Sequence, residues 1–225
     1  WVWKSGGEAV NIGVNSITGS TPSIASDVSA NTEAGFSIVK YTGNSTAAAT
    51  IGHELNSTPE LVIVKLIGGI SAKAWTVYAE PLGNTKYLYL DGTLAAGTYN
   101  FWNNTSPTSD VFTVSSDTNV NSSSGNYIAY CFHSVTGYSK IGSYTGNGSS
   151  TGPNVTTGFE PKFIMIKRTD TPGYGWYMMD SARGMDGTTG KFLFANTSAS
   201  EGTLGAGGLQ PNSTGFQITD AGAGF

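Results

Sequence analysis

The sequence predicts an all-β protein built from two tandem, antiparallel, jelly-roll-like β-sandwich modules. Three observations carry this prediction: the composition, the spacing of short apolar runs, and an internal repeat. Charged residues form 12% of the 225-residue chain, aromatic residues also reach 12%, and glycine occurs 31 times. A disordered chain has few aromatic residues, because it cannot bury enough apolar surface to offset its ordering entropy. The composition therefore indicates a folded chain that is rich in strands and turns.

Short apolar runs, separated by Gly, Asn, Ser and Pro, mark the expected strands, and no stretch has a sustained helical period. The runs recur about every 10 to 20 residues, a spacing that is typical of a sandwich or jelly roll. The expected strands are Phe36–Tyr41, Leu61–Leu66, Ala74–Tyr78, Lys86–Leu90, Val111–Val114, Asn126–His133, Tyr138–Tyr144, Lys162–Lys167, Gly175–Met179, Lys191–Phe194 and Gly215–Ile218.

An internal repeat relates the two halves of the chain. Gly35–Asn44 matches Gly137–Asn147, and the segment around Pro59 and Lys65 matches the one around Pro161 and Lys167. The spacing between matched residues stays close to 100, which indicates a duplication with small changes in loop length. Further matches join Trp75–Tyr78 to Trp176–Met179, Thr85–Tyr89 to Gly190–Phe194, and Phe112–Val114 to Phe216–Ile218.

The repeat predicts three segments. Residues 1–34 form a linker or an edge-strand segment, residues 35–136 the first sandwich repeat, and residues 137–225 a second repeat that is incomplete at its C-terminal end. The missing part is the counterpart of Asn126–Phe132, which we expect to be a central, buried strand because it is almost continuously apolar. We favour a continuation of the chain beyond Phe225 as its source, and the alternative is a strand from a neighbouring chain.

Charge and cysteine content exclude several classes of protein. A net charge of −4 and a pI near 5.0 provide no basic surface for nucleic acid. No apolar stretch approaches the ~18 residues of a membrane-spanning helix, so we expect no membrane insertion. The single cysteine, Cys131, lies in an apolar run and is predicted to be a small buried hydrophobe. Without a disulfide, stability must come from core packing or from oligomerisation.

Patterns for catalysis or metal binding are not found in the sequence. One cysteine and two histidines, His53 and His133, cannot supply the four ligands of a structural zinc site. Neither histidine has a visible acid partner, so both are interpreted as surface or capping residues, and no nucleophile elbow occurs. We therefore predict no catalytic residue, no metal and no cofactor. Glycan cleavage by paired carboxylates remains the enzymatic alternative.

A cluster of aromatic residues in turn-rich surroundings is the candidate ligand-binding site. Aromatic rings stack on the apolar faces of sugars, and nearby Asn side chains add hydrogen bonds. Trp75 and Trp176 occupy equivalent positions in the repeat, which favours a shared role in the core. Residues 99–103 have no clear counterpart in the second copy, so a specific ligand would bind there. The candidate residues are Tyr99, Phe101, Trp102 and Asn103.

The matched blocks, taken in order, resemble an uncharacterised repeat family found in tail-fibre and other virion structural proteins of tailed, often marine, bacteriophages. The blocks are Trp3–Lys4, Gly35–Gly43, Thr58–Lys65, Trp75–Tyr78, Leu82–Leu88, Phe101–Asn104, Tyr127–Phe132 and Gly142–Asn147. The resemblance covers nearly the whole chain and brings no catalytic motif with it. It implies a place on the virion exterior and a projecting or adhesive role, usually within a trimeric or higher assembly.

Three functions follow from these observations. The first is a non-catalytic structural and adhesive virion protein, a tail fibre or surface fibre, whose exposed loops contact host-surface glycan or protein. For it we expect a homo-oligomer, with a trimer favoured, that also contacts other virion proteins. The second is a bacterial cell-surface protein: a secreted adhesin, a filament subunit or a carbohydrate-binding module. The third is a fragment of a glycan depolymerase.

Overall fold

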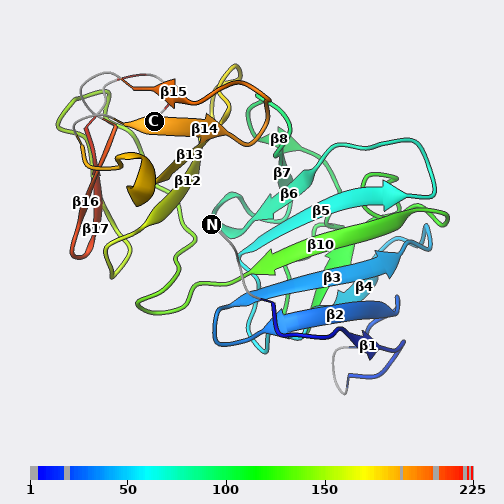
Figure 1. Cartoon of the computed structure of the whole chain (residues 1–225). Helices are drawn as coiled ribbons and strands as arrows, with labels where there is room; N and C mark the ends of the chain where they lie inside the picture. Colours follow the sequence, from blue (N-terminus) through cyan, green and yellow to red (C-terminus); the bar gives the residue numbers. More distant parts are fainter. Residues whose placement is uncertain are drawn as a thin grey trace. The chain divides into compact units, whose positions relative to one another are not determined.

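The protein is all-β, as predicted from the composition and the spacing of apolar runs (Figure 1). The computed structural model describes residues 5–17, 21–187, 190–204, 208–219, 222 and 224. Within these residues, the helical structure consists of two short 3-10 helices, η1 (Glu80–Leu82) and η2 (Ser181–Arg183). All pairings between the strands are antiparallel.

Two compact units make up the chain, and each has its own hydrophobic core. The N-terminal unit consists of Val2–Leu90 and Ala96–Val135. The C-terminal unit consists mainly of Thr136–Phe225 and also includes Asp91–Ala95. Each unit is described separately below.

A single large sheet forms the main layer of the N-terminal unit, in the order β1-β2-β3-β10-β5-β6-β7-β8. The strand expected to be central, β10, lies between β3 and β5 as predicted, with Tyr127 opposite Tyr41 and Leu66. The strands of this sheet are β1 (Val10–Ile12), β2 (Ser26–Asn31), β3 (Phe36–Thr42), β5 (Leu61–Gly68), β6 (Thr76–Ala79), β7 (Lys86–Tyr89), β8 (Gly97–Thr98) and β10 (Asn126–Phe132).

A two-stranded sheet of β4 (Ala49–Gly52) and β9 (Val111–Val114) contributes the second layer of this unit. Alternation along the strands directs every second side chain of the large sheet toward the core, as a period of two requires. Val39, Val62 and Val64 are fully buried there, together with Ile51 and Phe112 of the smaller sheet. The unit is therefore sandwich-like.

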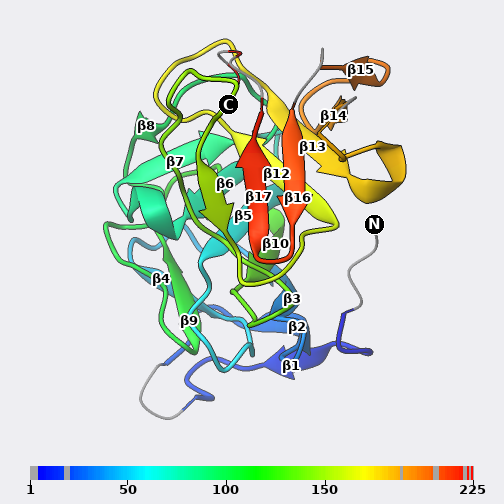
Figure 2. The same cartoon turned by 90° about the vertical axis from the view of Figure 1, so that its left-hand side faces the viewer.

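The C-terminal unit also contains two sheets, with fewer strands. One sheet has the order β12 (Phe163–Lys167), β13 (Trp176–Asp180), β14 (Lys191–Phe194) and β15 (Gly202–Thr203). The other has the order β11 (Asn154–Thr156), β17 (Gly215–Ile218) and β16 (Leu209–Asn212); the β16–β17 pair is plain in Figure 2. Its core contains Ile164, Ile166, Met179, Met185, Leu209, Phe216 and Ile218.

Several contacts occur at matched positions of the two units. The Lys65 ammonium donates to the carbonyl of Lys73, and the Lys167 ammonium donates to the carbonyl of Tyr174 at 2.8 Å. Ile51 lies opposite Phe112, and in the other unit Val155 lies opposite Phe216. These contacts agree with the proposed duplication, which itself stays a prediction.

One expected strand is wrong. Tyr138–Tyr144 has no regular strand structure, although its match in the first copy, β3, is a seven-residue strand. The segment has Gly142 in its interior, where β3 has no glycine, and glycine weakens a strand because it adds backbone entropy and has no side chain to pack. Sequence patterns also missed short or polar strands, namely β4, β8, β11, β15 and β16. Strands β1 and β2 lie in residues 1–34, the segment that was expected to be a linker or edge strands, at one edge of the large sheet.

Candidate functional site

The turn that follows β8, residues 99–104, carries the four predicted binding residues. Backbone hydrogen bonds fix the turn at Tyr99 and at Phe101. The Tyr99 amide donates to the carbonyl of Thr85 at 3.2 Å, and the Ser115 amide donates to the carbonyl of Phe101 at 2.8 Å. The turn is therefore tied to the start of β7 and to the end of β9.

Two consecutive asparagines close this turn in the left-handed region. Asn103 and Asn104 both have φ of 51°. Asn tolerates this conformation better than other residues with a side chain, because its short amide can form local hydrogen bonds. The Thr105 hydroxyl donates to the Asn103 carbonyl at 3.0 Å, and the Thr105 amide donates to the Trp102 carbonyl at 3.0 Å. This tight reversal returns the chain toward the core.

The four predicted residues lie in different environments. Phe101 and Trp102 are only 3% and 2% exposed, so their rings belong to the core and present no face to a ligand. The Trp102 ring packs edge-on against Tyr78 at 5.7 Å, and its indole N–H donates to the Lys86 carbonyl at 3.1 Å. Asn103 is partly buried. Tyr99, by contrast, is 50% exposed.

Tyr99 is the outer member of a group of packed rings that we call the aromatic shelf, defined by Tyr87, Tyr89, Tyr99 and Phe101. Ring centroids are 4.5 Å apart for Tyr99 and Phe101, 4.8 Å for Phe101 and Tyr87, and 4.9 Å for Tyr87 and Tyr89. These spacings are in the favourable range for tilted and edge-to-face aromatic pairs. The exposed ring therefore rests on a packed base.

Hydrogen bonding fixes the outer end of Tyr99. Its hydroxyl donates to a carboxylate oxygen of Asp117 at 3.0 Å, and this bond to the acid, followed by the negative charge itself, raises the pKa of Tyr99. The other carboxylate oxygen of Asp117 accepts from the amide and the side chain of Asn119, at 2.7 and 2.8 Å. The phenol thus stays neutral and oriented at physiological pH.

A glycine beneath Tyr87 makes the shelf compact. Gly97 lies opposite Tyr87 in the β7–β8 pair, and a Cβ atom at Gly97 would lie 2.4 Å from the ring. The same arrangement occurs in the C-terminal unit, where a Cβ atom at Gly202 would lie 2.3 Å from the Phe192 ring. Glycine is therefore required at both positions for the ring to cover the neighbouring strand.

Three residues of this site were not picked out beforehand: Tyr87, Tyr89 and Asp117. Tyr87 and Tyr89 share one face of β7, and their spacing of two is the signal that could have identified them. Asp117 carries no such signal, because it is 18 residues away from Tyr99 along the chain.

Residues 1–224 match the family described as a domain of unknown function, DUF7483. The chain belongs to this family. No curated protein and no solved structure matches the chain significantly.

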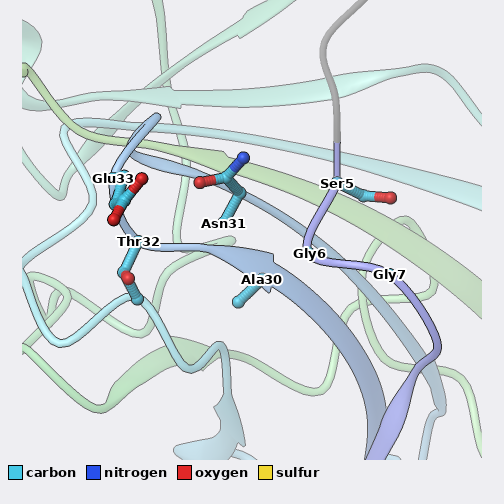
Figure 3. A pocket seen from close by; sticks show the side chains of 7 residues that line it. All are labelled: Ser5, Gly6, Gly7, Ala30, Asn31, Thr32 and Glu33. Carbon is cyan, nitrogen blue, oxygen red and sulfur yellow. The ribbon is translucent and has the colours of Figure 1, made fainter.

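A shallow, open depression is another surface feature of the N-terminal unit (Figure 3). It lies between the backbone of residues 5–7 and the end of β2, and Asn31 stands between Glu33 and that backbone. The Asn31 side chain accepts a hydrogen bond from the Ala34 amide at 3.0 Å. The residues that line the depression are Ser5, Gly6, Gly7, Ala30, Asn31, Thr32 and Glu33, a set with a single ionisable group.

His53 is fully buried, so the expectation of a surface histidine is wrong, whereas its ring does cap a backbone amide. The Leu55 amide donates to Nδ1 at 3.3 Å, so the ring proton lies on Nε2, which is 3.2 Å from the Thr108 carbonyl oxygen. Burial lowers the pKa of His53 to about 4. The imidazole is therefore neutral and holds two loops together. Its burial was not predicted because His53 lies in a polar turn of the sequence.

Cys131 is buried and free, as predicted, and burial raises the pKa of its thiol to about 12. In the part of the chain that the structure describes, no three His, Cys, Asp or Glu side chains gather as a metal site. No described helix is long and apolar enough to cross a membrane.

Two carboxylates of the C-terminal unit are engaged by cations and backbone groups. Asp180 accepts from the amides of Ala182 and Arg183 at 3.0 and 3.1 Å and pairs with the Arg183 guanidinium. Glu201 pairs with Lys191 at 3.0 Å and with Arg183 at 3.6 Å. Asp180 therefore caps η2, and Glu201 belongs to a surface ion-pair network.

Proposed function

We propose that this chain is a non-catalytic adhesive component of a virion exterior, a tail-fibre or surface-fibre protein that contacts host-surface glycan or protein through its aromatic shelf. The observation that carries the proposal is Tyr99, an exposed ring fixed by packing on one side and by Asp117 at its hydroxyl. The resemblance of the ordered sequence blocks to phage virion proteins supplies the location.

The geometry of Tyr99 favours recognition over chemistry. Tyrosine supplies a large contact area at a low cost in side-chain entropy, which is why it is enriched where proteins contact their partners. Here the ring is already ordered before any ligand arrives, because Phe101 supports it and Asp117 orients it. An ordered ring loses little further entropy on binding, so more of the stacking energy appears as affinity.

A single half-exposed ring gives a weak contact, and this is a reason to expect a multivalent assembly. Linking several identical sites makes the later binding events intramolecular, which raises the overall avidity by about 10²- to 10⁴-fold without a new contact. A homotrimer, the assembly implied by the resemblance, presents three shelves to a repetitive surface such as a polysaccharide. Bacterial surface polysaccharides are therefore the first ligands to test.

The experiment compares three forms of the full chain on an array of bacterial surface polysaccharides. The wild type is expected to bind a subset of the array. Tyr99→Ala is expected to reduce the affinity about tenfold or more, since loss of an anchoring tyrosine typically costs 1 to 2 kcal/mol or more. Tyr138→Ala is the matched control, because Tyr138 is similarly exposed, at 57%, and lies outside the shelf.

Two results would contradict the proposal. If Tyr99→Ala binds like the wild type, or if both variants lose affinity equally, the shelf is not the contact surface. Release of new reducing ends from a bound polysaccharide would show catalysis and would favour a depolymerase.

A further inference from the structure

The sequence around the exposed ring of the aromatic shelf has very few charges, and the charge beside the ring is an acid. Between Asp91 and Asp110 the chain has no Asp, Glu, Lys or Arg, so the turn that carries Tyr99 is uncharged. Between Asp110 and Lys140, the only such residue is Asp117. Asp117 is also the residue that accepts from the Tyr99 hydroxyl, at 3.0 Å. A ligand that stacks on this ring therefore meets a negative charge.

Lys86, on the shelf strand β7, lies on the other face of its hairpin. It is opposite Thr98 in the β7–β8 pair, and its ammonium donates to the Thr98 hydroxyl at 2.7 Å. Successive residues of a strand point to opposite faces, and the ring of Tyr87 covers Gly97 on the shelf side. In the part of the chain that the structure describes, no Lys or Arg forms an ion pair with Asp117. None of the described cations neutralises this carboxylate.

The carboxylate of Asp117 has room for one more donor. A carboxylate offers about four lone-pair positions, two on each oxygen. One oxygen accepts from the amide and the side chain of Asn119, and the other accepts from the Tyr99 hydroxyl. The remaining position is on the oxygen next to Tyr99. Asp117 is only partly buried, so a ligand on the ring can bring its own donor to this oxygen.

Both the ring and the acid favour a positive ligand over a negative one. The face of a tyrosine ring is electron-rich and attracts a cation within about 6 Å of its centre. The hydrogen bond from the Tyr99 hydroxyl to a carboxylate polarises the phenol further, which strengthens this attraction. An ammonium also forms a charge-assisted hydrogen bond with a carboxylate, whereas an anionic sugar is repelled by it.

We propose that the aromatic shelf selects glycans that carry a free amino group, with a sugar ring stacked on Tyr99 and an ammonium donating to Asp117. The ligand class is a saccharide with unacetylated amino sugars, and acidic glycans bind more weakly. This inference rests on the proposed function, because it specifies the ligand of the same surface. Asp117 thus has two roles: it orients the ring and it selects the charge of the ligand.

The test compares the hexamer of β-1,4-linked glucosamine with its fully N-acetylated form, which has the same sugar backbone and no charge. Both are attached to surfaces at equal density, and the full chain is passed over them at about pH 6, where amines are charged and carboxylates are ionised. The wild type should bind the amino form about fivefold more tightly, the combined effect of an exposed cation–π contact and an exposed ion pair. High salt should reduce this difference through screening.

A pair of charge-neutralising variants separates a local effect from a general one. Asp117→Asn keeps the size of the side chain and removes its charge, so the two affinities should come within about twofold of each other. Glu8→Gln is the matched control. It removes the same charge from an exposed residue that precedes β1, at the opposite edge of the large sheet from β8. This variant should keep the wild-type preference for the amino form.

Tyr99→Phe separates the two roles of Asp117. It keeps the aromatic ring and removes the hydroxyl that the acid orients. A preference that acts through the carboxylate itself should remain in this variant. If Tyr99→Phe loses the preference as completely as Asp117→Asn does, Asp117 only positions the ring, and the direct contact with an ammonium is wrong.

Two further results would overturn the inference and leave the proposed function standing, provided that Tyr99→Ala still lowers the affinity for both oligomers. One is equal binding of the two forms by the wild type, and the other is an equal loss of preference in Asp117→Asn and Glu8→Gln. No binding of either form would also overturn the inference, because the amino form is its predicted ligand. The polysaccharide array with Tyr99→Ala then decides the proposed function separately.

Discussion

The imidazole of His53 is a buried polar group whose two hydrogen bonds require the neutral form. Its pKa in the folded protein, about 4, is below the value of about 6.5 in an unfolded chain. The unfolded state therefore binds the extra proton between pH 6.5 and 4, and folding stability decreases as the pH falls through that window. Above pH 6.5 both states are neutral and the effect disappears.

This difference predicts a pH-dependent loss of stability. Lowering the pH from 7.5 to 4.5 should cost about 2.5 kcal/mol through His53 alone. Urea unfolding at the two pH values measures the loss in the wild type and in His53→Gln. The variant should be less stable at pH 7.5 but should lose about 2.5 kcal/mol less on acidification. An equal loss in both proteins would show that His53 does not titrate in this way.

At the scale of elements, the β7–β8 hairpin is defined by a ring lying over a glycine. Gly97→Ala places a methyl group within the space of the Tyr87 ring, which cannot swing aside freely because Phe101 and Tyr89 pack against it. Overpacking of this kind typically costs about 1 to 3 kcal/mol. Urea unfolding should detect the loss.

The matched control for Gly97→Ala is Gly142→Ala. Nothing lies within 4 Å of a Cβ atom at Gly142, and its φ is not in the left-handed region. This variant should remain within about 0.5 kcal/mol of the wild type. Equal stability of the two variants would mean that the Tyr87 ring adjusts without cost and that the shelf is not tightly packed.

Strands whose formation depends mainly on their own residues could be predicted from the sequence, and strands that depend on distant pairing partners could not. Strands β9 and β10 were predictable because their apolar runs are bounded by clear turn signals. Tyr138–Tyr144 matches β3 in the repeat but has Gly142 in its interior, and it forms no regular strand. Strand β4 (Ala49–Gly52) was missed because its small and polar residues carry little pattern; its pairing with β9 depends on contacts distant in sequence.

The candidate site was predicted in location but not in detail. The turn of residues 99–104 was identified from its aromatic content, yet a sequence cannot say which ring of a turn faces inward. Phe101 and Trp102 are in the core because the backbone reverses at Asn103, and Tyr99 is left outside. Asp117 was missed because its contact with Tyr99 depends on the return of the chain through β9.

For the whole molecule, we propose that the chain works as part of a multivalent adhesive assembly. The two cores show that folding does not require one continuous sheet, and each unit is sandwich-like in its own right. The shelf supplies one ordered aromatic contact per chain. Useful avidity from such a contact requires several copies held together.

The molar mass of the purified full chain in solution, measured by light scattering coupled to size exclusion, tests this claim most directly. We expect a stable trimer, with three times the 23.4 kDa mass of one chain. The trimer should persist on dilution to the concentrations used in the binding assays. A monomer of 23.4 kDa at every concentration would contradict it and would indicate a stand-alone binding module instead.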